Sequence, residues 1–164
     1  MKFNYYGFKA IYVHEMNRFI RTIGQSLLSP VISTSLYFVV FGSVIGNYIQ
    51  KIDGVSYGSY IVPGLLMLTL LTQSISNTSF GIFFPKFNGT INEILAAPIS
   101  TLETVLAFVG AGATKTLVVG AVIYATASFF ADVSVMYPML MIFLLVLVSF
   151  TFALFGFLIG VVSK

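Results

Sequence analysis

Long stretches without a charged residue constrain this chain more than any other feature. No Asp, Glu, Lys or Arg occurs between Arg21 and Lys51, between Asp53 and Lys86, or between Asp132 and Lys164. A helix crosses the hydrocarbon core of a membrane with about 20 mostly apolar residues, and each stretch is longer than that. Only 8% of the residues are charged, against about 25% in an average globular domain. The sequence therefore indicates an integral membrane protein.

Four membrane-spanning helices are predicted, and neither the alternation nor the short strand spacing of a β-barrel occurs. The fold class is all-α, with one transmembrane domain over residues 1–164. Lys115 lies inside the third predicted helix, about 24 Å before its end. We expect it close to the cytoplasmic boundary, with its ammonium group reaching out to water. The predicted spans cover residues 27–49, 57–84, 101–131 and 137–162.

The distribution of lysine and arginine predicts that both ends of the chain are cytoplasmic. Residues 1–24 are amphipathic, which predicts an interfacial helix lying along the cytoplasmic leaflet; the alternative is a plain stretch of positive charge. On this helix we expect Glu15 to form a surface ion pair with Arg18. The apolar arc comprises Tyr5, Phe8, Tyr12, Met16, Phe19 and Ile23, and the polar arc His14, Asn17, Arg18 and Arg21.

Catalytic chemistry finds little support in the composition. The chain has no cysteine and one histidine, so neither a thiol nucleophile nor a metal site is expected. His14-Glu15 opens like a zinc-protease motif, but Arg18 stands where the second histidine is required. Residues 110–116 (GAGATKT) suggest a phosphate-binding loop, but Val109 and Thr114 stand where that loop requires glycine. We expect these small residues to allow close helix packing, and we predict no bound cofactor.

The link between the second and third spans, residues 86–100, is predicted to hold a short cytoplasmic helix. Thr90 and Glu93 match a capping box, as do Ser100 and Glu103, and Pro98 would end the helix between them. The apolar residues of this helix would either dock a cytoplasmic partner or lie among lipid headgroups. They are Ile91, Ile94 and Leu95.

Polar side chains in the second span form one stripe, because Thr69, Gln73 and Asn77 follow one another at one-turn spacing. They either join helices by hydrogen bonds or line a conduit. The pairs Gly42–Gly46 and Gly156–Gly160 would permit close helix contacts, including contacts between subunits. No carboxylate is predicted deep in the core, and no intramembrane charge pair is predicted, which argues against a proton- or sodium-coupled carrier.

Taken together, these features resemble the ABC-2 type permeases, the membrane subunits of bacterial ABC exporters for drugs, lipid-linked polysaccharides and related amphiphiles. The resemblance runs through nearly the whole chain. It rests on residues 15–19 (EMNRF), Pro30 with residues 36–42 (LYFVVFG), residues 60–65 (YIVPGL), residues 86–87 (KF) and residues 90–100 (TINEILAAPIS).

The resemblance implies that the short cytoplasmic helix is the coupling helix that docks on a cytoplasmic ABC ATPase subunit. ATP would be bound and hydrolysed by that partner, so the chain itself would not be an enzyme. Two permease copies, surrounded by membrane lipids, would form the conduit. The docking residues carried over are Ile91, Asn92, Glu93, Ile94, Leu95 and Pro98, and the candidate conduit-lining residues are Thr69, Gln73 and Asn77.

The function implied is outward transport of a drug, lipid or glycan-type amphiphile across the bacterial inner membrane. Nucleic acid is not expected as a partner. Members of the family have six spans, and we expect this chain to represent the first four. Two other functions stay open: a non-transporting membrane scaffold or assembly subunit, and a secondary carrier.

Overall fold

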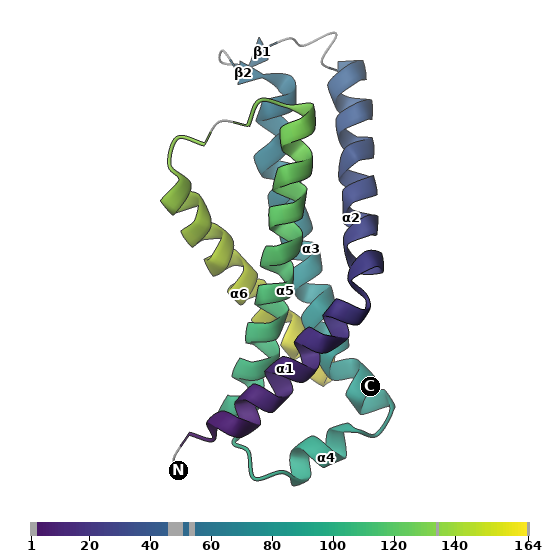
Figure 1. The fold of residues 1–164 in the computed structure, drawn as a ribbon, viewed down its shortest axis with the longest axis vertical. Helices are drawn as coiled ribbons and strands as arrows, with labels where there is room; N and C mark the ends of the chain where they lie inside the picture. Colours follow the sequence, from purple (N-terminus) through teal and green to yellow (C-terminus); the bar gives the residue numbers. More distant parts are fainter. Residues whose placement is uncertain (1–2, 46–50, 53–54, 134, 164) are drawn as a thin grey trace.

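The computed structural model describes residues 3–45, 51–52, 55–133 and 135–163 as a bundle of helices (Figure 1). Helix α1 crosses the lower end of the bundle, and the short α4 lies at that same end, opposite the strand pair β1–β2. The elements are α1 (Tyr5–Arg21), α2 (Ile23–Tyr37), the π-helical segment η1 (Phe38–Ile45), β1 (Lys51–Ile52), β2 (Val55–Ser56), α3 (Tyr57–Phe87), α4 (Ile91–Ala96), α5 (Thr101–Phe130) and α6 (Pro138–Val162).

Four of the helical segments are long and apolar enough to cross a membrane, as predicted: Ile23–Phe41, Tyr57–Phe87, Thr101–Phe130 and Pro138–Val162. The all-α membrane fold is therefore confirmed. The first span begins earlier than predicted, directly after Thr22, and passes into the wider π-helical turns of η1. The proposed Gly42–Gly46 contact lies outside the described residues.

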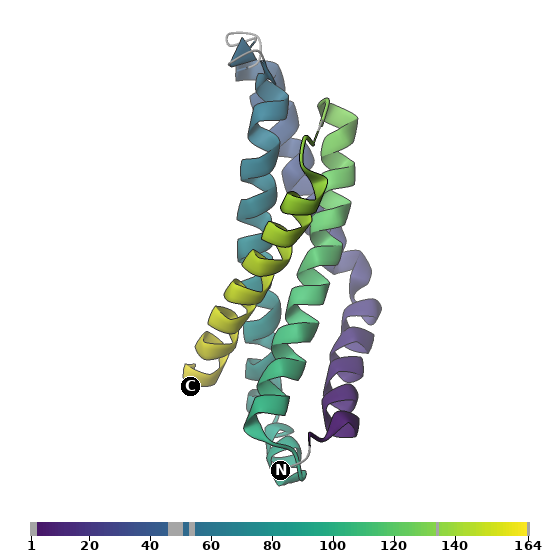
Figure 2. The same cartoon turned by 90° about the vertical axis from the view of Figure 1, so that its left-hand side faces the viewer.

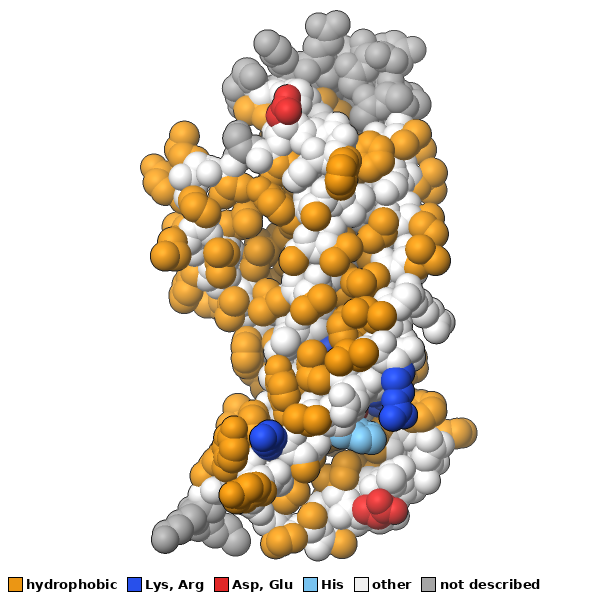
Figure 3. Space-filling model, in the orientation of Figure 1, with side chains coloured by type: hydrophobic (Ala, Val, Ile, Leu, Met, Phe, Trp, Pro, Cys, Tyr) orange, Lys and Arg blue, Asp and Glu red, His pale blue; other side chains and the backbone are white. Residues whose placement is uncertain are grey.

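The outer surface of the bundle is apolar along the middle of its length. On the face shown in Figure 3, charged side chains lie toward the two ends, and hydrophobic side chains cover the region between them. Large apolar side chains such as Phe129, Phe143 and Leu158 are exposed. This distribution suits a protein whose spans face hydrocarbon rather than water.

Helix α5 is the centre of the bundle and packs against α1, α2, α3 and α6. In an 18-residue stretch of its span 61% of the residues are buried, against 17–22% in the corresponding stretches of the other three spans. Its buried face is built from small and β-branched residues, which let neighbouring helices approach closely. That face includes Ala107, Ala111, Ala113, Val119, Ile123 and Ala127.

Helix α6 runs obliquely across α3 (Figure 2), and two glycines make their close contact. A Cβ atom on Gly156 would lie 2.5 Å from the carbonyl oxygen of Ile75, and one on Gly160 would lie 2.8 Å from that of Ser79. The prediction that this glycine pair permits a close helix contact is correct. Its neighbour, however, is α3 of the same chain rather than a second subunit.

Of the two predicted capping boxes, only the second one forms. The Glu103 amide donates to Ser100 Oγ at 3.3 Å, and the Ser100 amide donates to Glu103 Oε2 at 2.9 Å. Ser100 has the extended backbone that a cap residue needs. Thr90 is already helical, with φ −64° and ψ −18°, so its side chain does not cap α4 and the first prediction is wrong.

The tight contact between α6 and α3 makes Gly156 sensitive to a single added methyl group. We expect Gly156→Ala to lower the free energy of unfolding by about 1–3 kcal/mol, because the Cβ meets backbone that cannot rotate away. Thermal unfolding in detergent measures the effect. Gly64→Ala is the matched control, since a Cβ there meets nothing within 4 Å. Equal unfolding midpoints for the two variants would contradict the packing described.

Candidate functional site

Helix α1 packs against α5, and its buried face differs from the predicted apolar arc. Ile11, Glu15 and Phe19, spaced one turn apart, are the buried residues of this helix. Tyr5 and Ile23, which were assigned to the apolar arc, are exposed. Glu15 of α1 therefore lies inside the bundle, whereas the sequence pattern placed its carboxylate at the surface.

Glu15 forms a buried ion pair with Lys115 of α5. Lys115 Nζ lies 2.7 Å from Glu15 Oε2, and the same oxygen lies 2.8 Å from Arg18 Nη2. The side chains of Lys115 and Glu15 are 4% and 3% exposed, whereas that of Arg18 is 33% exposed. One carboxylate oxygen thus pairs with a cation from the bundle interior and a cation from its own helix.

This pair corrects two predictions. Lys115 does not reach out to water, because α1 brings a carboxylate to it inside the bundle. Glu15 does pair with Arg18, but it is buried rather than at the surface. The spanning helix α5 also takes part in a buried charge pair that the sequence did not predict, since the partner of Lys115 comes from a segment 100 residues away that was expected to lie along the leaflet.

Two further hydrogen bonds hold α1 to α5. The backbone amide of Asn4 donates to Glu103 Oε1 at 2.6 Å, and Tyr12 OH donates to Thr114 Oγ1 at 2.9 Å. Asn4 also caps α1, because its Oδ1 accepts from the Gly7 amide at 3.1 Å. Sequence reasoning missed Asn4, although asparagine directly before an amphipathic helix is a recognisable N-cap signal.

The predicted docking helix, α4, has an inner and an outer side. Ile94 packs inward against the buried cluster of Ile11, Ile82 and Phe108. Leu95, the next residue, is 74% exposed. Of the other predicted docking residues, Ile91 is half-buried, and Asn92, Glu93 and Pro98 are exposed. The predicted residues therefore divide between internal packing and the free surface.

A pocket of about 430 Å³ separates α4 from α1. It is lined by Ile11, His14, Glu15 and Arg18 of α1, by Phe84, Pro85 and Asn88 of α3, and by Glu93 and Ile94 of α4, among others. The buried ion pair thus lies beside a hollow that opens toward the short helix.

The polar stripe of α3 lies along one edge of that helix. Thr69 Oγ1 donates to the Leu65 carbonyl at 2.8 Å, and Asn77 Nδ2 donates to Gln73 Oε1 at 3.4 Å. All three side chains are half-buried, with the exposed Thr72 and Ser76 beside them. Within the described part of the chain, no hydrogen bond joins Thr69, Gln73 or Asn77 to another helix.

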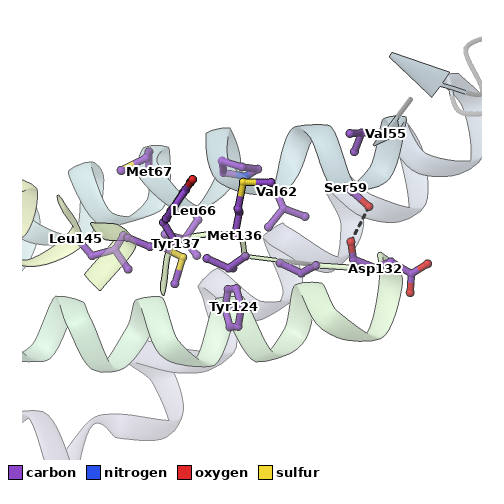
Figure 4. A pocket seen from close by; sticks show the side chains of 14 residues that line it. Val55, Ser59, Val62, Leu66, Met67, Tyr124, Asp132, Met136, Tyr137 and Leu145 are labelled. Carbon is purple, nitrogen blue, oxygen red and sulfur yellow. Dashed lines mark hydrogen bonds between the residues drawn. The ribbon is translucent and has the colours of Figure 1, made fainter. Parts of the chain in front are cut away.

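A second pocket, of about 410 Å³, lies at the end of the bundle away from α4. Figure 4 shows Val62 and Leu66 of α3, Tyr124 of α5 and Met136 of the following loop around one space. Nearby, Ser59 Oγ donates to the backbone carbonyl of Asp132 at 2.9 Å, which ties α3 to that loop. The lining is predominantly apolar and suits a hydrocarbon chain.

Glu103 is predicted to be important for stability, because its carboxylate serves both the cap of α5 and the start of α1. We expect Glu103→Ala to lower the unfolding midpoint through loss of its bonds to the Ser100 and Asn4 backbone amides. Glu93→Ala is the matched control: that carboxylate is exposed, and such surface changes usually stay within about 0.5 kcal/mol. The unfolding midpoints of the two variants in detergent measure the effect. Equal midpoints would contradict the stabilising role assigned to Glu103.

Comparison with known proteins agrees with this architecture. The family described as ABC-2 type transporter matches residues 6–164. The inner membrane transport permease YadH of Escherichia coli strain K12 is 38% identical over 156 residues, covering 95% of this chain, and the protein of that name in Shigella flexneri matches equally well. The chain spans 61% of the length of these relatives. No solved structure matches.

The four spans and the inner-membrane relatives agree that this is a multi-pass protein of the inner membrane. The family match covers nearly the whole chain, and the curated relatives share more than a third of its residues. The chain belongs to the ABC-2 type transporter family.

Proposed function

We propose that the chain is part of the permease subunit of an ATP-driven exporter in the bacterial inner membrane. The observation that carries this proposal is the two-sided helix α4, which is anchored inward by Ile94 and presents Leu95 outward. Leu95 is 74% exposed and lies outside the four candidate spans, so in this proposal a protein partner rather than lipid covers it. With both ends of the chain cytoplasmic, α4 faces the compartment in which ATP is found.

In this proposal a cytoplasmic ABC ATPase docks on the exposed side of α4. Asn92, Glu93 and Leu95 contact the partner, while Ile94 passes the applied force inward. Ile94 packs against the buried cluster that contains Ile11 of α1, Ile82 of α3 and Phe108 of α5, so movement of α4 acts on a cluster shared by three helices. ATP is bound by the partner, and this chain supplies no catalytic residue.

The conduit is proposed to run along the polar edge of α3, between two copies of the permease. Thr69, Gln73 and Asn77 would offer hydrogen bonds to the polar part of a substrate. Hydrocarbon makes such an edge costly unless protein or water covers it. The apolar pocket beside Met67 and Met136 would hold the hydrocarbon part, and methionine adapts to varied shapes. An amphiphile such as a drug, a lipid or a lipid-linked glycan fits both regions.

One observation favours a second function, a secondary carrier. Buried ionisable groups inside a membrane bundle often belong to ion or proton pathways, and Glu15 with Lys115 forms such a pair. Transport that persists after deletion of the neighbouring ATPase gene would support the carrier. A complex that binds the ATPase but moves no compound would instead support a scaffold.

Leu95 tests the docking of the ATPase. In the full-length permease, coexpressed with its candidate ABC ATPase, we expect Leu95→Asp to reduce ATPase copurification at least about tenfold. A charge in the centre of an apolar contact costs more than 1.4 kcal/mol. Val55→Asp is the control, because Val55 is also exposed but belongs to β2 at the other end of the bundle. Unchanged copurification with Leu95→Asp would refute this docking surface.

Ile94→Asp separates docking from folding. Since Ile94 packs inside the bundle, this variant should lower the unfolding midpoint, which Leu95→Asp should leave nearly unchanged. Equal midpoints for the two variants would contradict the inward placement of Ile94.

Thiol labelling tests the conduit, and the chain contains no native cysteine to interfere. In the assembled full-length transporter, we expect cysteines in place of Gln73 and Asn77 to react with a charged thiol reagent, because a conduit admits water. Leu147→Cys on α6 is the control: Leu147 is exposed on an apolar span and should face lipid, where thiolate is disfavoured. Inertness at both conduit positions would count against a polar pathway along α3.

A further inference from the structure

Burying the charges of Glu15 and Lys115 costs much free energy, and their ion pair contributes little stability in return. Removing a carboxylate and an ammonium group from water costs several kcal/mol for each ion, and a packed apolar pair often serves stability as well or better. Both side chains are nevertheless almost completely buried, with 2.7 Å between Nζ and Oε2. What this pair supplies beyond an apolar contact is a fixed geometry.

That geometry involves three helices. Glu15 belongs to α1 and Lys115 to α5, while Gly81 of α3 is so close that a Cβ there would lie 3.4 Å from Glu15 Oε2. Arg18 holds the same oxygen from within α1. Displacing α1 along α5 would separate two charges in apolar surroundings, which is far more costly than sliding apolar side chains past each other.

The inner contact of α4 lies one turn from this ion pair. Ile11, a member of the buried cluster against which Ile94 packs, precedes Glu15 by four residues on the buried face of α1. A contiguous path therefore leads from Ile94 of α4 to Ile11 and Glu15 of α1, and on to Lys115 of α5. Its steps are the buried cluster against which Ile94 packs, one turn of α1, and the ion pair.

We propose that Glu15 and Lys115 are positioning residues for transport: their ion pair makes α1 and α5 move as one body, so that displacement of α4 by the ATPase reaches the central spanning helix. This inference rests on the proposed function of the chain as an ATP-driven permease. Loss of the pair uncouples ATP hydrolysis from rearrangement of the conduit while the ATPase stays bound.

The test uses the full-length permease with its ATPase in liposomes and needs no knowledge of the substrate. The reporter is a cysteine in place of Asn77, labelled by a charged thiol reagent with and without ATP. We expect Lys115→Met and Glu15→Gln to reduce the ATP-dependent change in labelling rate about tenfold, within the usual range of coupling between sites. ATPase copurification and ATP hydrolysis should persist.

A charge exchange separates positioning from simple structural support. The double variant Glu15→Lys/Lys115→Glu again places one carboxylate between two cations, because Arg18 is retained, and should restore the ATP-dependent change. Lys9→Met is the matched control, since Lys9 is an exposed lysine of α1. Should Lys115→Met fail to assemble, Glu15→Gln and the double variant decide in its place.

The outcomes distinguish this inference from the function on which it rests. If the unmutated transporter shows no ATP-dependent labelling change, the proposed function fails. If it shows that change and the single variants retain it, the positioning role alone is overturned. A double variant that assembles with the ATPase but stays uncoupled also overturns it.

Discussion

The hydrocarbon interior of a membrane holds no water to satisfy a polar group, and this constraint governs the whole bundle. Backbone groups are satisfied within the helices, and threonine hydroxyls bond to carbonyls one turn earlier, as Thr69 does to Leu65 and Thr126 to Val122. The buried ammonium group of Lys115 is satisfied by Glu15, which α1 supplies. This ion pair joins the amphipathic helix to the central span, together with the hydrogen bonds from Asn4 and Tyr12.

Close packing of small residues completes the bundle. Lipid tails are as apolar as leucine, so burying large hydrophobic side chains gives little drive for helices to associate. Many of the large ones accordingly lie outside, as Phe129 and Phe143 do, while alanine and glycine fill close contacts of α5 and α6. Gly156 and Gly160 let α6 lie directly on the backbone of α3.

The end of the bundle that carries α4 concentrates the features relevant to function. Adjacent residues of α4 have opposite surroundings, because Ile94 packs inside and Leu95 is exposed. Helix α1 contributes Ile11 to the buried cluster against which α4 packs, and it contacts α5 through Glu15. Asn4 fixes the first turn of α1 to Glu103. Under the proposed function, this arrangement lets a force applied at the surface act on the bundle as a whole.

The sequence determined the spans, because charge-free stretches and hydrocarbon thickness require nothing beyond the chain itself. It also determined the cap at Ser100, a local contact between residues three positions apart. The family resemblance drew attention to α4, but the pattern alone did not distinguish Ile94 from Leu95, since both are apolar residues on a short helix.

Only the tertiary structure decided that Glu15 meets Lys115, that Gly156 meets α3, and that Ile94 faces inward. These contacts join segments distant in the chain, so they depend on how the helices cross, and periodicity within one helix carries no information about that crossing. From the sequence alone, Lys115 was expected to extend its ammonium group to water. A charged side chain in a spanning helix can be stabilised either by solvent or by an oppositely charged partner. The way the helices cross decides between hydration and ion pairing.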